Sequence, residues 1–242
     1  MRVPKNPEDI FDDFSKDWRD TFHSQVQSII LYGSAARGDY VPRKSDINFL
    51  IVLSAEAMKS LRKAIPLVQK WRKKAVSAPL LLTWDYIQHS LDSFPIEFLS
   101  MKLHHRTIFG EDVLEDLQLK PEHVRLQLER EFKGKLLHLR EGLLIHGDHR
   151  DNLLELLYRS MKAFLPLFEG FLYLHGETVP VERQELVKNV VARVQGNAAI
   201  FEDVFKAMEQ KTRLHKEELL TLFEGYIDEI ERIANYVDQI DS

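Results

Sequence analysis

The chain of 242 residues contains no cysteine, which excludes disulfide bonds and thiolate metal sites. Its 33 basic residues against 38 acidic ones give a net charge of -5, so no general positive surface for nucleic acid is expected. No apolar run approaches the roughly 20 residues needed to cross a bilayer. The polar start MRVPKNPEDIFDDF is not typical of a secretory signal. We therefore expect a cytoplasmic protein with neither a membrane nor a nucleic acid as partner.

The N-terminal part of the chain alternates short apolar runs with helical patterns. Residues 28–32 and 47–53 are rich in β-preferring side chains and predict two buried strands. A third strand is predicted at 78–82, followed by a short helix capped by Thr83, and a fourth at 95–101. Apolar residues at helical spacing predict covering helices in residues 7–27 and 55–76, the second kinked or divided by Pro66.

Beyond residue 110 the β-branched runs end and leucine-rich helical periodicity replaces them. One apolar face begins at Pro121 and ends at Gly147, and further helical patterns cover residues 151–175, 186–194, 201–208 and 219–240. None of these segments is hydrophobic all round, so they must pack together as a bundle. We accordingly expect two domains, 1–120 and 121–242.

The stretch LYGSAARGDYVPRKSDINFLIVL, residues 31–53, has features suited to binding phosphate. A strand that ends in Gly33-Ser34 and turns into a helix presents backbone N–H groups, a hydroxyl and the positive end of a dipole. Asp46 and Asn48 are two residues apart on a predicted strand, so their oxygen atoms project from one face and suit Mg²⁺ on nucleotide phosphates. Each signal alone has a structural alternative, with Ser34 as a helix N-cap and Asp46 as a turn carboxylate held by Ser45.

The ordered combination of GS, then ARG at 36–38, then SDIN before an apolar strand resembles the motif of the DNA polymerase β-like nucleotidyltransferase superfamily. The similarity is to its small bacterial branch, which includes antibiotic nucleotidyltransferases, and covers about residues 27–110. FPIEFLSMK and the FGED at 109–112 further resemble one bacterial group within that branch. The resemblance implies an α+β protein, in which a small mixed β-sheet nucleotidyltransferase domain is followed by an all-α helical bundle.

The same resemblance implies a third carboxylate on a later strand, and the best match is Glu97 inside the apolar run 95–101. An exposed strand edge is the alternative for this residue. Asp46 and Glu97 are then the catalytic residues, Asp46, Asn48 and Glu97 the metal ligands, and the nucleotide contacts come from Gly33, Ser34, Arg37 and Ser45. For Arg37 a solvated helix start is an equal alternative.

The implied cofactor is Mg²⁺, with Mn²⁺ as a substitute, and the implied substrate is a nucleoside triphosphate. A hydroxyl of a small molecule or a protein would attack the α-phosphorus and expel pyrophosphate, assisted by Glu97 as base or metal ligand. The sequence specifies neither this acceptor, nor the nucleotide, nor the oligomeric state.

The family pattern has aspartate at the position of Asn48. Asparagine offers one neutral carbonyl oxygen, whereas aspartate offers two oxygens and a full charge. Metal affinity follows the charge count of the ligands, so weaker Mg²⁺ binding is expected. Slow activity, activity that needs Mn²⁺ and no activity all remain open. The second hypothesis is therefore a catalytically inactive module that binds nucleotide or another partner.

Two histidine patterns offer weaker alternatives. His104-His105 would face opposite sides of a strand and could not easily share a metal ion. Arg140 and His146 resemble the spacing of HEPN-type ribonuclease domains, which are also helical bundles. Six residues rotate a helix by about 240°, so these two side chains converge only if the helix ends or bends between them.

Overall fold

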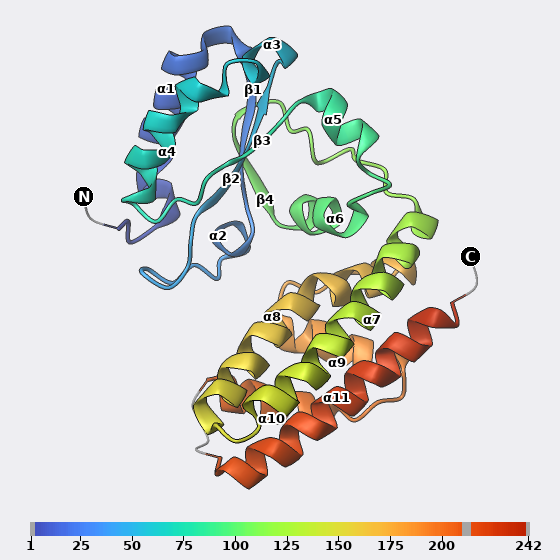
Figure 1. Ribbon diagram of the computed structural model, residues 1–242. Coiled ribbons are helices and arrows are strands. Elements are labelled where there is room, and N and C mark those ends of the chain that lie inside the picture. Colours follow the sequence, from blue (N-terminus) through green and yellow to red (C-terminus); the bar gives the residue numbers. More distant parts are fainter. Residues whose placement is uncertain (1–2, 210–213, 241–242) are drawn as a thin grey trace. The chain divides into compact units, whose positions relative to one another are not determined.

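The computed structural model describes residues 3–209 and 214–240, and its contacts divide the chain into two compact units, Met1–Leu119 and Lys120–Ser242 (Figure 1). The N-terminal unit contains, in chain order, η1 (Pro7–Ile10), α1 (Phe11–Phe22), η2 (His23–Gln25), β1 (Val26–Tyr32), α2 (Ser34–Arg37), β2 (Asn48–Leu53), α3 (Ala55–Met58), η3 (Leu61–Ala64), α4 (Ile65–Arg72), β3 (Leu80–Leu82), α5 (Trp84–His89), α6 (Pro95–Leu103) and β4 (His105–Gly110). The C-terminal unit contains α7 (Pro121–His146), α8 (Arg150–Leu174), α9 (Arg183–Arg193), α10 (Ala198–Met208) and α11 (Lys216–Asp238).

The four strands form one mixed sheet in the order β3-β2-β1-β4. β1 pairs antiparallel with β2 on one side and with β4 on the other, whereas β2 and β3 are parallel. A parallel pair needs a crossover, and the chain supplies one through α3, η3 and α4 between β2 and β3. The mixed sheet of the predicted α+β class is thus confirmed.

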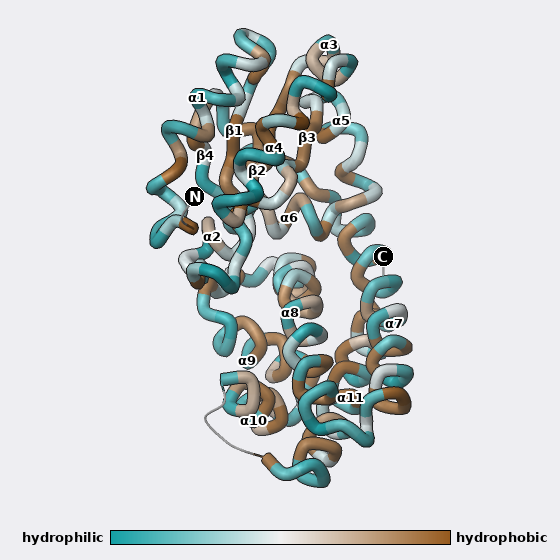
Figure 2. The backbone as a smooth tube through the Cα atoms, turned by 60° about the vertical axis from the view of Figure 1, so that its left-hand side comes forward, coloured by the Kyte–Doolittle hydropathy of each residue, from teal (hydrophilic) through white to brown (hydrophobic). Residues whose placement is uncertain are grey.

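Helices cover both faces of the sheet, with α1 and α4 on one side and α5 and α6 on the other (Figure 1). The first face carries a core of fully buried aromatic rings, in which Phe14 of α1 stacks on Phe49 of β2 with ring centroids 4.0 Å apart. Trp71 of α4 meets the same Phe14 ring edge-on, and its indole N–H donates to Asp17. Figure 2 shows β1 and β2 as hydrophobic segments, as expected for strands covered on both faces.

The predicted strand at 95–101 is wrong, because these residues form helix α6. Pro95 occupies the start of the helix, where its missing N–H costs nothing, and the buried residues Ile96, Phe98, Leu99 and Met101 do not alternate as strand residues would. The fourth strand is instead β4, which begins at His105. Among the other predictions, the strand near 80–82 and the helix capped by Thr83 are confirmed, since the Thr83 hydroxyl accepts from the Tyr86 N–H.

The C-terminal unit is the predicted bundle, with α7 ending at Gly147 as expected. α8 continues through Pro166, and the buried rings of Phe132, Phe164, Phe168, Phe201 and Tyr226 join α7, α8, α10 and α11. Across the described ranges, none of the helices combines the length and the apolar character needed to span a bilayer.

Candidate functional site

The Gly33-Ser34 turn joins β1 to the single helical turn α2. Gly33 has φ +75° and Gly38, which ends α2, has φ +92°, conformations that side-chain-bearing residues rarely adopt. The backbone N–H groups of Ala36 and Arg37 donate to the Gly33 carbonyl, at 3.1 and 3.0 Å, and close the turn. The two glycines therefore let the chain reverse direction at the end of the sheet.

Asn48 lies against this turn. It is the first residue of β2 and pairs with Tyr32, the residue before Gly33. A Cβ atom placed on Gly33 would be 3.4 Å from the side-chain nitrogen of Asn48. The structure thus brings together two of the elements predicted from the sequence, the glycine-serine turn and the amide that stands where the family has a carboxylate.

Asp46 follows a small closed loop. The hydroxyl oxygen of Ser45 accepts from the Val41 N–H at 3.1 Å, and the Ser45 N–H donates to the Val41 carbonyl at 2.9 Å. Asp46 comes next, with an exposed side chain, immediately before the fully buried Ile47. Ser45 therefore shapes the loop that presents Asp46 to solvent.

The negative charge of Asp46 acts on the phenol of Tyr40. Burial raises the pKa of the Tyr40 phenol, and the negative charges of Asp46 and Asp9 raise it further. The phenol donates to the Pro4 carbonyl at 3.1 Å, which keeps its ring in place. The Asp46 carboxylate thus acts on the phenol of Tyr40 as a nearby negative charge.

Asn48 and Phe49 project from opposite faces of the sheet, as the strand alternation predicted. Phe49 is buried against α1, so the Asn48 side chain belongs to the face that α5 and α6 cover (Figure 1). Glu97 is exposed and lies in the first turn of α6, not on a strand. Glu97 is therefore not a strand residue beside Asn48, and its link to this site is that α6 covers the face to which Asn48 belongs.

Arg37 is the last residue of α2, and its side chain is only 9% exposed. Its Nε atom lies 4.0 Å from an Asp39 carboxylate oxygen. The alternative of a solvated arginine is therefore wrong, because the side chain is largely removed from solvent.

The donor set near the turn fits a metal ion only in part. Within the described residues, no group of three or more histidine, aspartate or glutamate side chains is placed to hold a metal. Asp46 offers one charged carboxylate and Asn48 one neutral oxygen, whereas Mg²⁺ takes about six oxygen ligands. These residues fit an ion that arrives with nucleotide phosphates, since the phosphates bring most of the ligands.

Two further residues share this end of the sheet and were not predicted as site residues. Tyr32 pairs with Asn48 on one side and with His105 of β4 on the other, so the three side chains form one row on one face. Burial raises the pKa of Tyr32. The FGED motif at 109–112 was the feature of the sequence that could have indicated this row, because its aspartate, Asp112, is a hydrogen-bond partner of His105.

His105 is fixed by that aspartate. Its Nε2 lies 2.8 Å from Asp112 Oδ2, and its Nδ1 lies 2.9 Å from the Lys102 carbonyl. Burial by itself would raise the pKa of Asp112, but hydrogen bonds from His105, the Leu114 N–H and Thr107 outweigh it and hold that pKa below its usual range. His104 caps α6 and is buried, so the two adjacent histidines serve different elements.

Arg140 and His146 do not meet the geometric condition set for a nuclease pair. α7 is continuous from Pro121 to His146, so the rotation of about 240° between the two positions is retained. The Arg140 guanidinium lies 2.7 Å from a carboxylate oxygen of Glu231 on α11. Its contact is an interhelical ion pair within the bundle.

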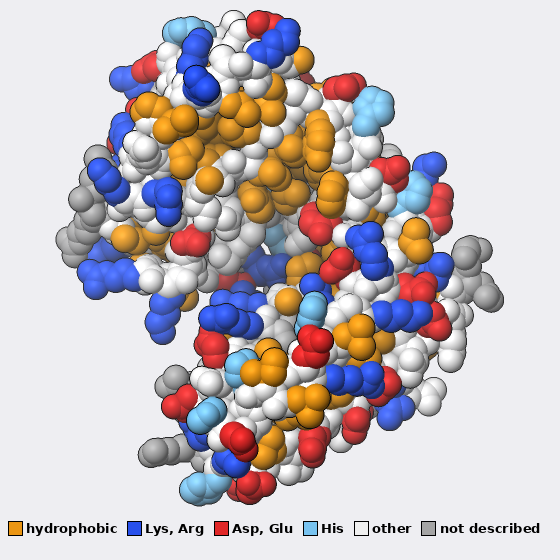
Figure 3. All heavy atoms as spheres, in the orientation of Figure 1, with side chains coloured by type: hydrophobic (Ala, Val, Ile, Leu, Met, Phe, Trp, Pro, Cys, Tyr) orange, Lys and Arg blue, Asp and Glu red, His pale blue; other side chains and the backbone are white. Residues whose placement is uncertain are grey.

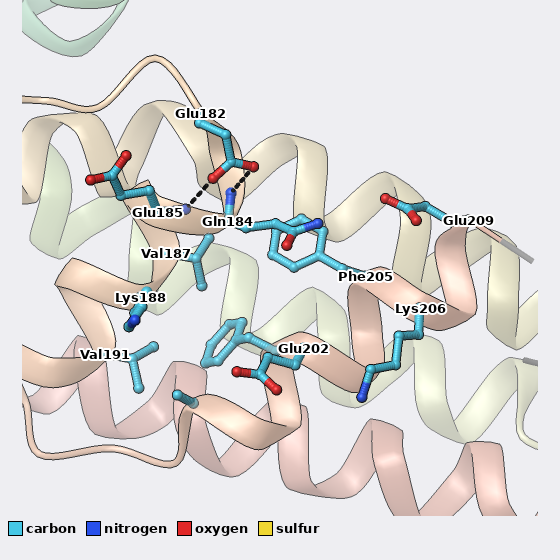
Figure 4. Close-up of a pocket in the computed structure, with 12 residues that line it drawn as sticks. Glu182, Gln184, Glu185, Val187, Lys188, Val191, Glu202, Phe205, Lys206 and Glu209 are labelled. Carbon is cyan, nitrogen blue, oxygen red and sulfur yellow. Dashed lines mark hydrogen bonds between the residues drawn. The ribbon is translucent and has the colours of Figure 1, made fainter. Parts of the chain in front are cut away.

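A separate cavity of about 790 Å³ lies between α9 and α10 in the C-terminal unit (Figure 4). Its lining includes Val187, Val191 and Phe205, and also Glu182, which accepts hydrogen bonds from the N–H groups of Gln184 and Glu185. None of the predicted site residues lines it.

Comparisons with known proteins show what the chain is similar to. A model of the nucleotidyltransferase domain family matches residues 10–103. In structure, the chain resembles a spectinomycin adenyltransferase from Enterococcus faecialis, crystallised with ATP and spectinomycin, with a TM-score of 0.52 and 13% sequence identity over 93% of this chain and 100% of that one. At this identity the likeness shows a shared fold. No curated protein matches the chain significantly.

Proposed function

We propose that this chain, whose N-terminal unit is a nucleotidyltransferase domain of the DNA polymerase β-like superfamily, binds a nucleoside triphosphate with Mg²⁺ at the Gly33-Ser34 turn. It would transfer the nucleoside monophosphate to a hydroxyl of a small molecule or a protein, at a rate limited by Asn48. The chain's similarity to an adenyltransferase solved with ATP and an antibiotic supports a small-molecule acceptor.

The observation that carries the proposal is the contact between Asn48 and Gly33. A Cβ atom on Gly33 would lie only 3.4 Å from the side-chain nitrogen of Asn48. The position at which the family has a carboxylate therefore borders the turn proposed to bind phosphate. Asp46, two residues earlier, is exposed and free of the hydrophobic core. An anion at the turn and a cation at Asp46 would therefore be neighbours, as a metal–triphosphate complex requires.

The chain's own residues would act mainly by positioning. The N–H groups at the start of α2 and the Ser34 hydroxyl would hold the outer phosphates, while Asp46 and the Asn48 oxygen would hold the metal. A bound Mg²⁺ would neutralise charge on the phosphates. Glu97 on α6 would accept the proton of the acceptor hydroxyl. Most of the rate would come from orientation and from charge stabilisation.

The second candidate is a nucleotide-binding module without turnover. Asn48 favours this second candidate, because the residue that would share a metal with Asp46 is a neutral amide. Among the described residues, no group of three or more carboxylate or histidine side chains is placed to hold a metal instead. Both candidates require nucleotide binding, and only the first requires pyrophosphate release.

Asp46→Asn is expected to abolish stabilisation by nucleotide. The substitution keeps the shape but removes the charge that would hold the metal, so the increase in Tm given by Mg²⁺ and triphosphate should disappear. Thermal unfolding with each triphosphate, with and without Mg²⁺, measures this effect. Asp85→Asn is the matched control, because Asp85 is highly exposed on α5. An equal increase in Tm for the Asp46 variant and the unaltered chain would contradict the proposed site.

Glu97→Gln is expected to lower pyrophosphate release about 100-fold while nucleotide affinity stays unchanged, as for loss of a general base. Pyrophosphate release and calorimetry measure the two quantities, and the Asn48→Asp background supplies turnover should the natural chain have none. Glu115→Gln, at another exposed glutamate, is the control. Equal loss in both variants, or none in the Glu97 variant, would remove Glu97 from the mechanism.

A further inference from the structure

Strand β3 has one open edge. It is terminal in the strand order and pairs through Leu80, Leu81 and Leu82 with β2 alone among the described strands. The N–H and C=O groups on the outer side of such a strand are a template for another strand.

One usual protection of an edge strand, charged side chains on the strand itself, is lacking here, although β3 is only three residues long. Natural edges carry lysine or other charged residues that oppose pairing with a second chain. Residues 75–84, AVSAPLLLTW, contain no charged side chain. The proline of this stretch precedes the strand, so it removes no N–H group from Leu80–Leu82.

Apolar side chains surround this edge. Figure 3 shows hydrophobic side chains gathered over the region where Figure 1 places α4, β3 and α5. The exposed large apolar residues of these elements are Ile65 at 53%, Leu80 at 37%, Trp84 at 44% and Tyr86 at 49%. Isolated exposed apolar residues are ordinary, but a gathered set beside an open strand edge marks an interaction surface.

We infer that this edge joins a second copy of the chain, with β3 pairing antiparallel to its own copy across a two-fold axis at Leu81. The pairing would place Leu80 opposite Leu82 of the copy and make one continuous sheet of both N-terminal units. The uncharged stretch is complementary to itself, since no like charges would meet across the axis. α4 and α5 flank the edge on opposite faces, so their exposed apolar residues would be covered on both sides of the sheet.

Molecular mass in solution tests the dimer. Sedimentation equilibrium over about 1–100 μM should show twice the monomer mass, and Leu80→Lys and Tyr86→Lys should each raise the dissociation constant about tenfold or more. Tyr86 lies outside the strand, so its variant keeps the test valid should Leu80→Lys unfold the sheet. Leu144→Lys is the control, because Leu144 is 87% exposed on α7 in the other unit. A monomer at every concentration, or a dimer retained in both edge variants, would overturn the inference.

The absence of cysteine allows a test of the register. A cysteine at position 81 would face its own copy, and opposed residues of antiparallel strands lie within disulfide reach. Under mild oxidation Leu81→Cys should give a covalent dimer at least about ten times faster than Thr83→Cys or Leu144→Cys. Equal rates for all three variants would show random collision and exclude the proposed pairing.

Discussion

Asn48→Asp is expected to raise pyrophosphate release about tenfold or more in the presence of Mg²⁺. The added carboxylate restores a second charged ligand beside Asp46, and cation affinity increases with the charge of the ligands. The substitution should mainly increase the affinity for Mg²⁺, so half-maximal activity should occur at a lower Mg²⁺ concentration. The measurement is pyrophosphate release against Mg²⁺ and Mn²⁺ concentration at saturating triphosphate.

A second effect of this substitution distinguishes a restored metal site from a general effect of charge. Without metal, two neighbouring carboxylates repel, so the free energy of unfolding should decrease by about 0.5–1 kcal/mol, and Mg²⁺ with nucleotide should more than restore it. Asn235→Asp adds the same charge at an exposed position of α11, far from the turn in the sequence, and should leave the dependence of activity and stability on Mg²⁺ and nucleotide unchanged. Unchanged metal affinity in the Asn48 variant would mean that the site lies elsewhere.

Gly110→Ala is expected to unfold the N-terminal unit. Gly110 has φ +79°, and an added Cβ would lie 1.9 Å from the Gln27 carbonyl oxygen, closer than any real contact. On either side of Gly110, the Ser28 hydroxyl bonds to the carbonyl oxygens of Phe109 and Glu111, at 3.2 and 2.6 Å, and holds the end of β4 against β1. The backbone must separate there, so we expect the free energy of unfolding to fall by more than about 4 kcal/mol, a large part of the roughly 5–15 kcal/mol of an ordinary domain.

Tryptophan fluorescence during urea unfolding measures this loss in the N-terminal unit alone, because Trp18, Trp71 and Trp84 are the only tryptophans of the chain. Gly38→Ala is the matched control, since Gly38 has φ +92° but open space around the position of a Cβ. It should cost only the left-handed strain of about 1–2 kcal/mol. Similar losses in the two variants would show that backbone conformation, and not the collision with β1, governs Gly110.

The elements predicted correctly are those in which the local pattern of apolar and capping residues matches the burial and contacts that the element has in the folded protein. The uniform apolar runs of β1 and β2, the Thr83 cap and the leucine face of α7 each indicated their structure. Residues 95–101 failed because the run is apolar at nearly every position, and such a run cannot be assigned to strand or helix from periodicity. The wrong assignment placed Glu97 on the sheet, whereas it lies at the start of α6, and the actual fourth strand begins at His105, for which the sequence had indicated only a histidine pair.

By itself, the sequence determined the character of the two parts of the chain and the order of the turn, the loop and the acidic strand start. These are properties of neighbouring residues, and side-chain periodicity and glycine placement express them directly. Only the tertiary structure decided which residues meet. The register of β1 against β2 and β4 sets Asn48 beside Gly33 and places Tyr32 and His105 in one row, and strand order leaves β3 with an open edge. Such contacts join residues far apart in the chain, and their pairing energy depends on the whole sheet rather than on any local pattern.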